Sequence, residues 1–133
     1  MPSSFRTDLI TRFTDDGKFI VHEPFEFQSC IAEAIIRVLV GFVTDFASIP
    51  WGLRNIFSPT GKYGKAAVIH DKLYQEGRVG TRAISRAEAD AIFNEGMEVL
   101  PVRRITRWCL YYGIRAGGWL AWWRYRRAEK RTT

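Results

Sequence analysis

The spacing of apolar residues changes once along this 133-residue chain, and that change constrains the fold more than any other feature. As far as about residue 43, β-branched and aromatic residues come in short runs separated by turn signals, which is typical of strands. From residue 63 onward, apolar residues recur every three or four positions, which is typical of amphipathic helices. Strands followed by helices predict an α+β fold, with a small antiparallel N-terminal sheet followed by three helices in one domain.

The strand region begins with a hairpin signal. Residues 10–13 and 19–22 flank an Asp-Gly turn, and Pro24 ends the hairpin or restricts it to a sheet edge. Residues 25–31 predict a third extended segment. The β-branched run at 35–43 predicts one further strand, with Gly41 as a bulge or tight turn. Pro50 suits the start of a short helix at 50–57.

Three helices are predicted in the second half of the chain. The first covers residues 63–75, and the second starts at Ser85, where Glu88 completes a capping box, and ends near Pro101. The third runs from about residue 103 to residue 130, and it could kink at Gly117 and Gly118. Its apolar stripe is predicted to consist of Ile105, Trp108, Tyr112, Ala116, Trp119 and Trp123.

The positive charge of the chain is concentrated at one end. Twenty Lys and Arg residues against fourteen Asp and Glu residues give a net charge of +6, yet residues 101–133 carry +8 and residues 1–100 carry −2. The length suits one domain, which we place at residues 1–123, followed by a basic extension at 124–133. An apolar fraction of 47% excludes wholesale disorder.

Cysteine usage and hydropathy exclude further classes of protein. Cys30 and Cys109 are too few for a disulfide scaffold or a zinc ribbon, and we expect two buried free thiols in a reducing compartment. The N-terminus lacks the pattern of a signal peptide. The most apolar segment, residues 108–123, is too short and too interrupted to be a transmembrane segment.

Five polar residues from separate segments are candidates for one site. Asp45 and Ser48 lie in a polar loop after the last strand, and His70 and Asp71 are adjacent in the first helix. Asp90 is predicted to face inward from the second helix, where its carboxylate needs a partner, for which the neighbourhood of His70 and Asp71 and the side chain of Arg86, four residues earlier, are the candidates. Carboxylate and imidazole ligands suit a divalent ion such as zinc or manganese, which would activate water for hydrolysis. The predicted metal ligands are Asp45, His70, Asp71 and Asp90.

Other chemistries remain open for these residues. Ser48, His70 and Asp90 could form a nucleophilic triad, although no oxyanion-hole signature accompanies them. A pairing of Cys30 with His70 lacks an activating partner. Without catalysis, the same polar side chains would form a buried network that holds the strand–loop–helix junction together.

Several segments of the chain resemble a known family. They are 41–50 (GFVTDFASIP), 66–74 (AAVIHDKLY), 86–93 (RAEADAIF) and 111–115 (YYGIR). Their order and spacing across residues 35–118 are similar to a phage and prophage family catalogued as domain of unknown function 1353. Val40 stands where that family usually has a proline, which should alter only the turn. The polar positions that the family retains are Thr44, Asp45, Ser48, His70, Asp71 and Asp90.

The resemblance implies a protein of a tailed phage or prophage, for which two functions are open. In the first, it is a metal-dependent hydrolase that acts on the cell wall during entry or lysis. Its catalytic residues would then be Asp45, Ser48, His70, Asp71 and Asp90. In the second, it is a non-enzymatic tail, head or accessory protein whose polar residues brace the fold. Both functions place it in the host cytoplasm during infection, or in the virion.

The C-terminal segment offers a separate surface for a partner. Its tryptophans alternate with arginines, which suits a protein interface, a membrane surface or single-stranded nucleic acid. We expect another phage protein as the partner, a membrane surface next, and nucleic acid last because no nucleic-acid module is present. A core-packing helix with a solvated basic face is the alternative. The predicted partner-binding residues are Trp119, Trp122, Trp123, Arg124, Arg126 and Arg127.

Overall fold

The structure is a computed structural model that describes residues 2–44, 53 and 62–132. The strands of its N-terminal part are β1 (Ser4–Phe5), β2 (Thr11–Phe13), β3 (Phe19–Val21), β4 (Phe25–Ser29), β5 (Ala34–Val38) and β6 (Val43–Thr44). The elements that follow are α1 (Gly64–Glu76), β7 (Arg78–Val79), β8 (Arg82–Ala83), α2 (Arg86–Val99), α3 (Arg104–Gly117) and α4 (Trp119–Thr132).

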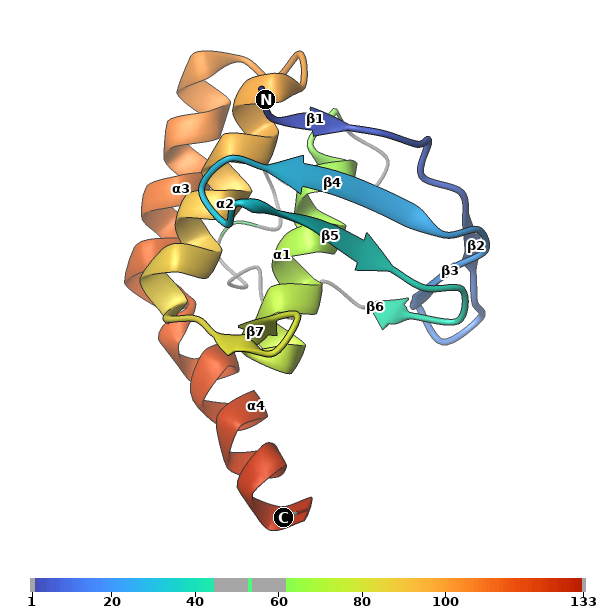
Figure 1. Cartoon of the computed structure of the whole chain (residues 1–133), viewed down its shortest axis with the longest axis vertical. Coiled ribbons are helices and arrows are strands. Elements are labelled where there is room, and N and C mark those ends of the chain that lie inside the picture. The colour runs from blue at the N-terminus through green and yellow to red at the C-terminus, as the bar shows by residue number, and fades with distance from the viewer. Residues whose placement is uncertain (1, 45–52, 54–61, 133) are drawn as a thin grey trace.

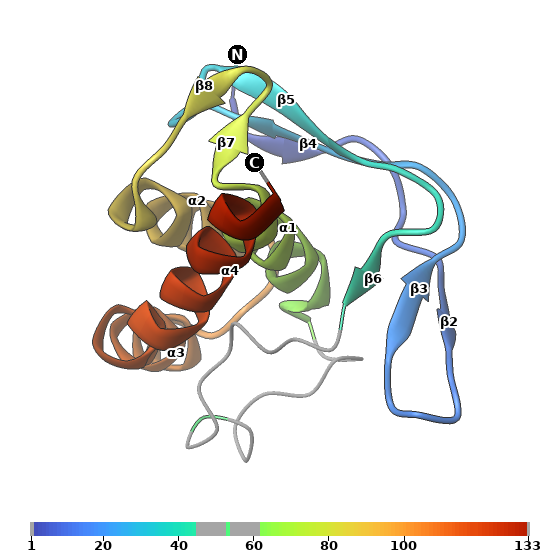
Figure 2. The same cartoon turned by 90° about the horizontal axis from the view of Figure 1, so that it is seen from below.

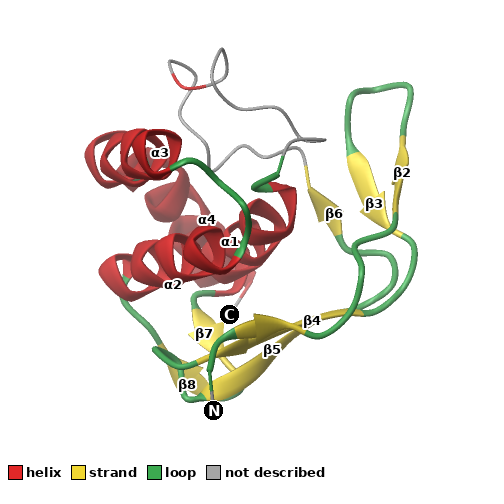
Figure 3. Cartoon of the chain, turned by 90° about the horizontal axis from the view of Figure 1, so that it is seen from above, coloured by secondary structure: helices red, strands yellow, loops and turns green. Residues whose placement is uncertain are grey.

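The described strands form antiparallel sheets, and the helices lie in layers beside one of them. One sheet has the order β1-β4-β5, a second has the order β2-β3-β6, and β7 pairs with β8. Helices α1 and α2 pack against the β1-β4-β5 sheet, and α3 and α4 pack on α1 and α2 (Figure 1, Figure 3). The β2–β3 hairpin and β6 extend to one side of these layers (Figure 2). The predicted α+β class is confirmed.

The core lies between the β1-β4-β5 sheet and the first two helices. Along β4, Phe25 and Phe27 are buried and alternate with partly exposed polar residues, which is the pattern of a strand with one covered face. These rings pack in one cluster with buried residues of both helices, such as Ile69 and Phe93. The predicted hairpin and third extended segment correspond to β2, β3 and β4.

The predicted single strand at 35–43 is wrong, because two short strands of different sheets occupy it. β5 pairs with β4, whereas β6 pairs with β3. The chain turns between them at Gly41, whose φ of 92° is the left-handed conformation that favours glycine. The N–H of Phe42 donates to the carbonyl of Leu39 at 3.2 Å and closes the turn. Gly41 therefore acts as the predicted tight turn and passes the chain from one sheet to the next.

The first two helices match their prediction closely, and the third does not. Ser85 caps α2 by accepting a hydrogen bond from the N–H of Glu88 at 3.1 Å. The single helix expected over residues 103–130 is two helices, α3 and α4, so the described residues contain four helices rather than three. The helix is interrupted at Gly118, where a Cβ would lie 2.6 Å from the hydroxyl of Tyr74. The short helix predicted at 50–57 lies outside the described residues, apart from Leu53.

The apolar stripe predicted for the last helix faces solvent, so the alternative in which this stripe packs in the core does not hold for the described residues. Its exposed fractions run from 36% at Trp108 to 77% at Ile105, and every other member is exposed as well. The buried face of α3 carries Leu110 and Ile114 instead. Both faces of these helices carry apolar residues at helical spacing, so periodicity alone could not decide which face packs inward.

Two further expectations bear on compartment and topology. Cys30 and Cys109 are both exposed free cysteines, so the prediction that both thiols are buried is wrong. Cys30 lies in the turn after β4, and Cys109 lies on the solvent side of α3. Across residues 2–44, 53 and 62–132, no helix combines the length and the apolar character that a membrane span requires.

Candidate functional site

The carboxylate of Asp90 is the centre of a buried polar cluster that joins three helices. Its Oδ1 accepts a hydrogen bond from the Tyr74 hydroxyl at 2.6 Å and lies 2.8 Å from Nε2 of His70. Its Oδ2 accepts hydrogen bonds from Nη1 of Arg115 at 2.7 Å and from Nη1 of Arg86 at 3.3 Å. The side chain of Asp90 is fully buried, so the prediction that it faces inward and finds a partner is confirmed.

Helical spacing brings these side chains together. His70 and Tyr74 lie one turn apart on α1, and Arg86 and Asp90 lie one turn apart on α2, so each pair shares a helix face. Arg115 comes from the last turn of α3. The ring of His70 lies 4.2 Å from that of Tyr74, measured between centroids, and 4.8 Å from that of Phe93. The cluster therefore has polar contacts at its centre and aromatic packing around it.

Charge and hydrogen bonding keep Asp90 ionised and Tyr74 protonated. Burial by itself would raise the pKa of Asp90, but His70, Tyr74 and Arg115 stabilise the carboxylate and hold its pKa below the ordinary value. Burial raises the pKa of Tyr74 far above its ordinary value, and the neighbouring Asp90 charge adds to that rise. The phenol therefore remains a hydrogen-bond donor to an ionised carboxylate.

Arg86 connects the cluster to the end of α3. Its Nη1 donates to the carbonyl of Ile114 at 3.1 Å, and its Nη2 donates to the carbonyl of Arg115 at 3.0 Å. These are carbonyls of the last helical turn, where a cation is favoured by the partial negative charge of the helix end. One guanidinium thus binds the Asp90 carboxylate and caps α3.

Asp71 is fully buried at a different junction from Asp90. Its Oδ2 accepts a hydrogen bond from Nε2 of Gln75 at 2.8 Å, and Nε2 of Gln75 also lies 3.2 Å from the carbonyl of Val43 in β6. Consecutive helical residues point about 100° apart, so Asp71 and its neighbour His70 serve different sides of α1. Asp45 and Ser48, the other two predicted site residues, lie outside the described residues.

The chemistry of the Asp90 cluster suits a structural role better than metal binding. Both carboxylate oxygens already accept hydrogen bonds, and two of the donors are guanidinium groups whose charge opposes a nearby dication. Within the part of the chain that the structure describes, no three His, Cys, Asp or Glu side chains gather in a way that could hold a metal ion.

The cluster contains two members of the predicted triad in contact. His70 and Asp90 are the imidazole and carboxylate of that arrangement, and the serine assigned to it falls outside the described residues. In a triad the carboxylate orients the imidazole and stabilises the imidazolium that forms during the reaction. Asp90 instead also bonds Tyr74 and two arginines, so its contacts are those of a hub between helices. The alternative pairing of Cys30 with His70 sets an exposed thiol against a fully buried ring.

A third buried carboxylate, Glu95 of α2, was missed by the sequence analysis. Its Oε1 accepts from the Ser29 hydroxyl at 2.6 Å, and its Oε2 accepts from the Ser3 hydroxyl at 2.6 Å. The backbone N–H groups of Cys30 and Ile31 also donate to Oε2, at 2.8 and 3.1 Å. Glu95 lies three residues after buried Ile92, so the argument that placed Asp90 inward would have found it.

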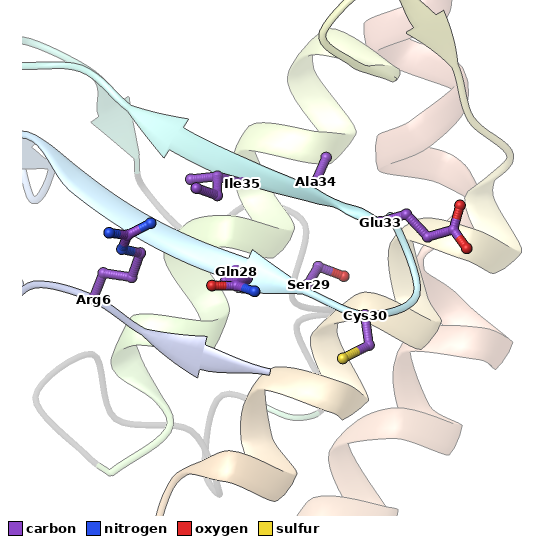
Figure 4. Close-up of a pocket in the computed structure, with 7 residues that line it drawn as sticks. All are labelled: Arg6, Gln28, Ser29, Cys30, Glu33, Ala34 and Ile35. Atoms are coloured by element: carbon purple, nitrogen blue, oxygen red, sulfur yellow. The ribbon is translucent and has the colours of Figure 1, made fainter. Parts of the chain in front are cut away.

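The turn that Glu95 holds lines an open pocket. This pocket has a volume of about 600 Å³ and lies at the β4–β5 end of the sheet. Figure 4 shows Arg6 at one end of it and the Cys30 thiol near the turn at the other. Glu33, in the same turn, has a positive φ of 54°, which is uncommon for a residue other than glycine.

The predicted partner-binding residues divide into two groups. Trp122 and Arg126 face the protein: Trp122 packs edge-on against Tyr74 with 5.2 Å between ring centroids, and Nη2 of Arg126 donates to the carbonyls of Tyr74 and Gln75 at 2.7 Å each. The boundary predicted at residue 123 therefore falls inside a helix that is anchored beyond it. The group that faces solvent consists of Trp119, Trp123, Arg124 and Arg127.

The fold and the cluster define a class: a small α+β protein whose sheet and helices are joined by buried carboxylate hubs. The model of the protein family DUF1353, which is described as a protein of unknown function, matches residues 19–114. This match covers more than half of the chain. The chain belongs to this family, as its sequence motifs predict. No curated protein and no solved structure gives a significant match to the chain.

Proposed function

We propose that this protein is a non-enzymatic accessory protein of a tailed phage or prophage, and that it binds another protein through the solvent face of α3 and α4. The Asp90 cluster supports the non-enzymatic part, because its contacts join helices. In this proposal the protein acts in the host cytoplasm during infection or as part of the virion.

The observation that carries the proposal is the run of exposed apolar side chains on the last two helices. We define the outer face by Ile105, Trp108, Tyr112, Trp119, Leu120 and Trp123, all of which are exposed. Aromatic side chains dominate the energetic centres of protein interfaces. An exposed apolar surface of this kind typically marks an interaction site. The outer face therefore has the composition of a binding surface.

Charge favours an acidic protein as the partner. Arg104, Arg124 and Arg127 are exposed on the same two helices, and the guanidinium of Arg127 lies 4.9 Å from the centroid of the Trp123 ring. Only one acidic residue, Glu129, occurs in residues 101–133. Two copies of this chain would bring like charges together at the outer face. An acidic surface with apolar hollows would complement it.

Matched charge reversals test the proposal. The double variant Arg124→Glu/Arg127→Glu alters the outer face, and Arg6→Glu/Arg12→Glu makes the same change of charge at exposed positions elsewhere. We expect one protein to co-purify with the unaltered chain and with Arg6→Glu/Arg12→Glu. The same protein should not co-purify with Arg124→Glu/Arg127→Glu. Equal recovery with both variants would contradict the proposal.

Binding to lipid vesicles distinguishes a protein partner from a membrane surface. Tryptophan fluorescence is measured with vesicles of phosphatidylcholine alone and with vesicles that also contain phosphatidylglycerol. We expect no saturable blue shift at physiological salt with either kind. A saturable shift with the anionic vesicles, abolished in Trp119→Ala/Trp123→Ala, would assign the outer face to a membrane surface instead.

A further inference from the structure

The outer edge of β5 is an unpaired strand edge next to a groove. β5 is the last strand of the β1-β4-β5 sheet. The direction of its backbone groups follows from β4, because the carbonyl of Glu26 accepts from the N–H of Arg6 at 3.1 Å and so faces β1. Backbone groups alternate sides along a strand. Those of Phe25 and Phe27 therefore face β5.

The same alternation fixes which groups of β5 point away from the sheet. Phe25 is paired with Val38, and Phe27 is paired with Ile36, so the backbone groups of these two β5 residues face β4. The N–H and C=O groups of Ile35 and Arg37 then point outward. In the described part of the chain, no strand pairs with this edge. Such an edge is a template for one more strand.

A groove of about 250 Å³ runs along this edge. One wall is β5, through residues 35–37, and the opposite wall is formed by α1 and by β7 with the turn that follows it. Three cations line the groove, Arg37, Lys72 and Arg78, against one acid, Glu76. The lining therefore has an excess of positive charge beside unpaired backbone groups.

Of these three cations, Arg78 is the one held most loosely. Lys72 pairs with Glu76, which also lines the groove, and both Nε and Nη2 of Arg37 donate to Glu26, at 3.0 and 2.9 Å. Arg78 lies 3.7 Å from Glu129, and both of those side chains are well exposed. An exposed pair of this kind contributes little to stability and rearranges easily. An incoming carboxylate can therefore compete for Arg78.

A like charge nearby strengthens the case for an anionic occupant. Burial lowers the pKa of Arg126, Glu129 opposes that change, and the charge of Arg78 lowers the pKa further. Arg126 also lies against Gly77, the residue between α1 and β7, so these two cations are close together beside the groove. An acidic ligand in the groove would relieve that repulsion.

We propose that the β5 edge and its groove bind an extended acidic segment of another protein, which adds to the β1-β4-β5 sheet as a fourth strand. Main-chain hydrogen bonds to Ile35 and Arg37 supply the affinity, and the arginines select acidic side chains. This site is separate from the outer face of α3 and α4.

The test titrates the ¹⁵N-labelled full chain with an acetylated and amidated octapeptide of alternating Glu and Val. The matched probe replaces each Glu with Lys. We expect the acidic peptide to shift the amide signals of Ile35, Arg37 and Val79 and to slow exchange of the outward N–H groups. The basic peptide should do neither. Equal shifts with both peptides, no shifts with either, or shifts confined to α3 and α4 would overturn the proposal.

Variants locate the binding to the edge itself. Ile35→Pro removes one outward N–H and leaves the bonds to β4 intact, which a sheet edge tolerates. We expect this variant to bind the acidic peptide about tenfold more weakly. Arg78→Glu should weaken binding of the acidic peptide while leaving β5 unaltered. Arg12→Glu, the same change at an exposed position on β2, should leave the affinity unchanged. Unchanged affinity in Arg78→Glu would contradict the proposal even if Ile35→Pro fails to fold. Concentration-dependent shifts of the same amides without peptide would assign the edge to a second copy.

Discussion

At the scale of single residues, two buried carboxylates organise the protein. Asp90 accepts hydrogen bonds from α1, α2 and α3, and Glu95 accepts them from the N-terminal segment and from the β4–β5 turn. A buried carboxylate is costly unless its oxygens are satisfied, and here several donors converge on each one. Both residues lie on α2, which makes that helix the hub of the fold.

Loss of the Asp90 carboxylate should destabilise the protein strongly. Asp90→Ala would remove the carboxylate that accepts from two guanidinium groups and from a buried phenol, and we expect the free energy of unfolding to fall by about 3–5 kcal/mol. Asp15→Ala, at an exposed turn position, should change it by less than about 0.5 kcal/mol. Urea denaturation measures both. A loss in Asp90→Ala as small as that in the control would show that the cluster does not brace the fold.

The pH dependence of stability should carry the signature of Asp90. Its pKa is lowered in the folded state, so its stabilising effect is complete above the unfolded carboxyl pKa of about 3.9 and is lost as the pH falls through the lower folded value. The difference in unfolding free energy between the unaltered chain and Asp90→Asn should therefore be constant from neutral pH to about pH 5. Below about pH 4 it should shrink. A difference that persists unchanged to pH 2 would contradict this account.

At the scale of elements, the spacing of apolar residues and the capping signal predicted those helices and strands that depend on local sequence. The hairpin, α1, and α2 with its Ser85 cap follow from β-propensity, helical period and a side-chain cap. The split at Gly41 depends on β3, a partner far away in the chain, and the close approach of Tyr74 to Gly118 is likewise a long-range contact. The inward position of Asp90 was predictable from α2 alone, whereas its contact with Arg115 required the packing of α3.

The cost of a side chain at position 118, between α3 and α4, should depend on Tyr74. A Cβ at Gly118 would lie 2.6 Å from the Tyr74 hydroxyl and 2.7 Å from the carbonyl of Ile114, so Gly118→Ala should cost about 1–3 kcal/mol of stability. In a Tyr74→Phe background the hydroxyl is gone, and the same substitution should cost less. Equal costs in the two backgrounds, measured by thermal or urea unfolding, would show that the Tyr74 hydroxyl does not limit what fits at position 118.

At the scale of the whole molecule, the basic C-terminal third is two things at once. Its inner side, with Trp122 and Arg126, packs on Tyr74 and caps α1, and its outer side presents aromatic rings and arginines to solvent. The +8 charge of residues 101–133 was readable from composition. Which of its tryptophans face outward was not, because both faces are apolar and only tertiary packing selects between them.

Site-specific photocrosslinking measures most directly whether the outer face is the binding surface. A benzophenone amino acid replaces Trp123 in the full chain, and the matched position is Phe13, an exposed aromatic residue of β2. In cells that carry the protein's natural partners, position 123 should crosslink to one other protein, and position 13 should not. The crosslink should disappear in Arg124→Glu/Arg127→Glu. Crosslinks of equal yield at the two positions, or none at position 123, would contradict the account.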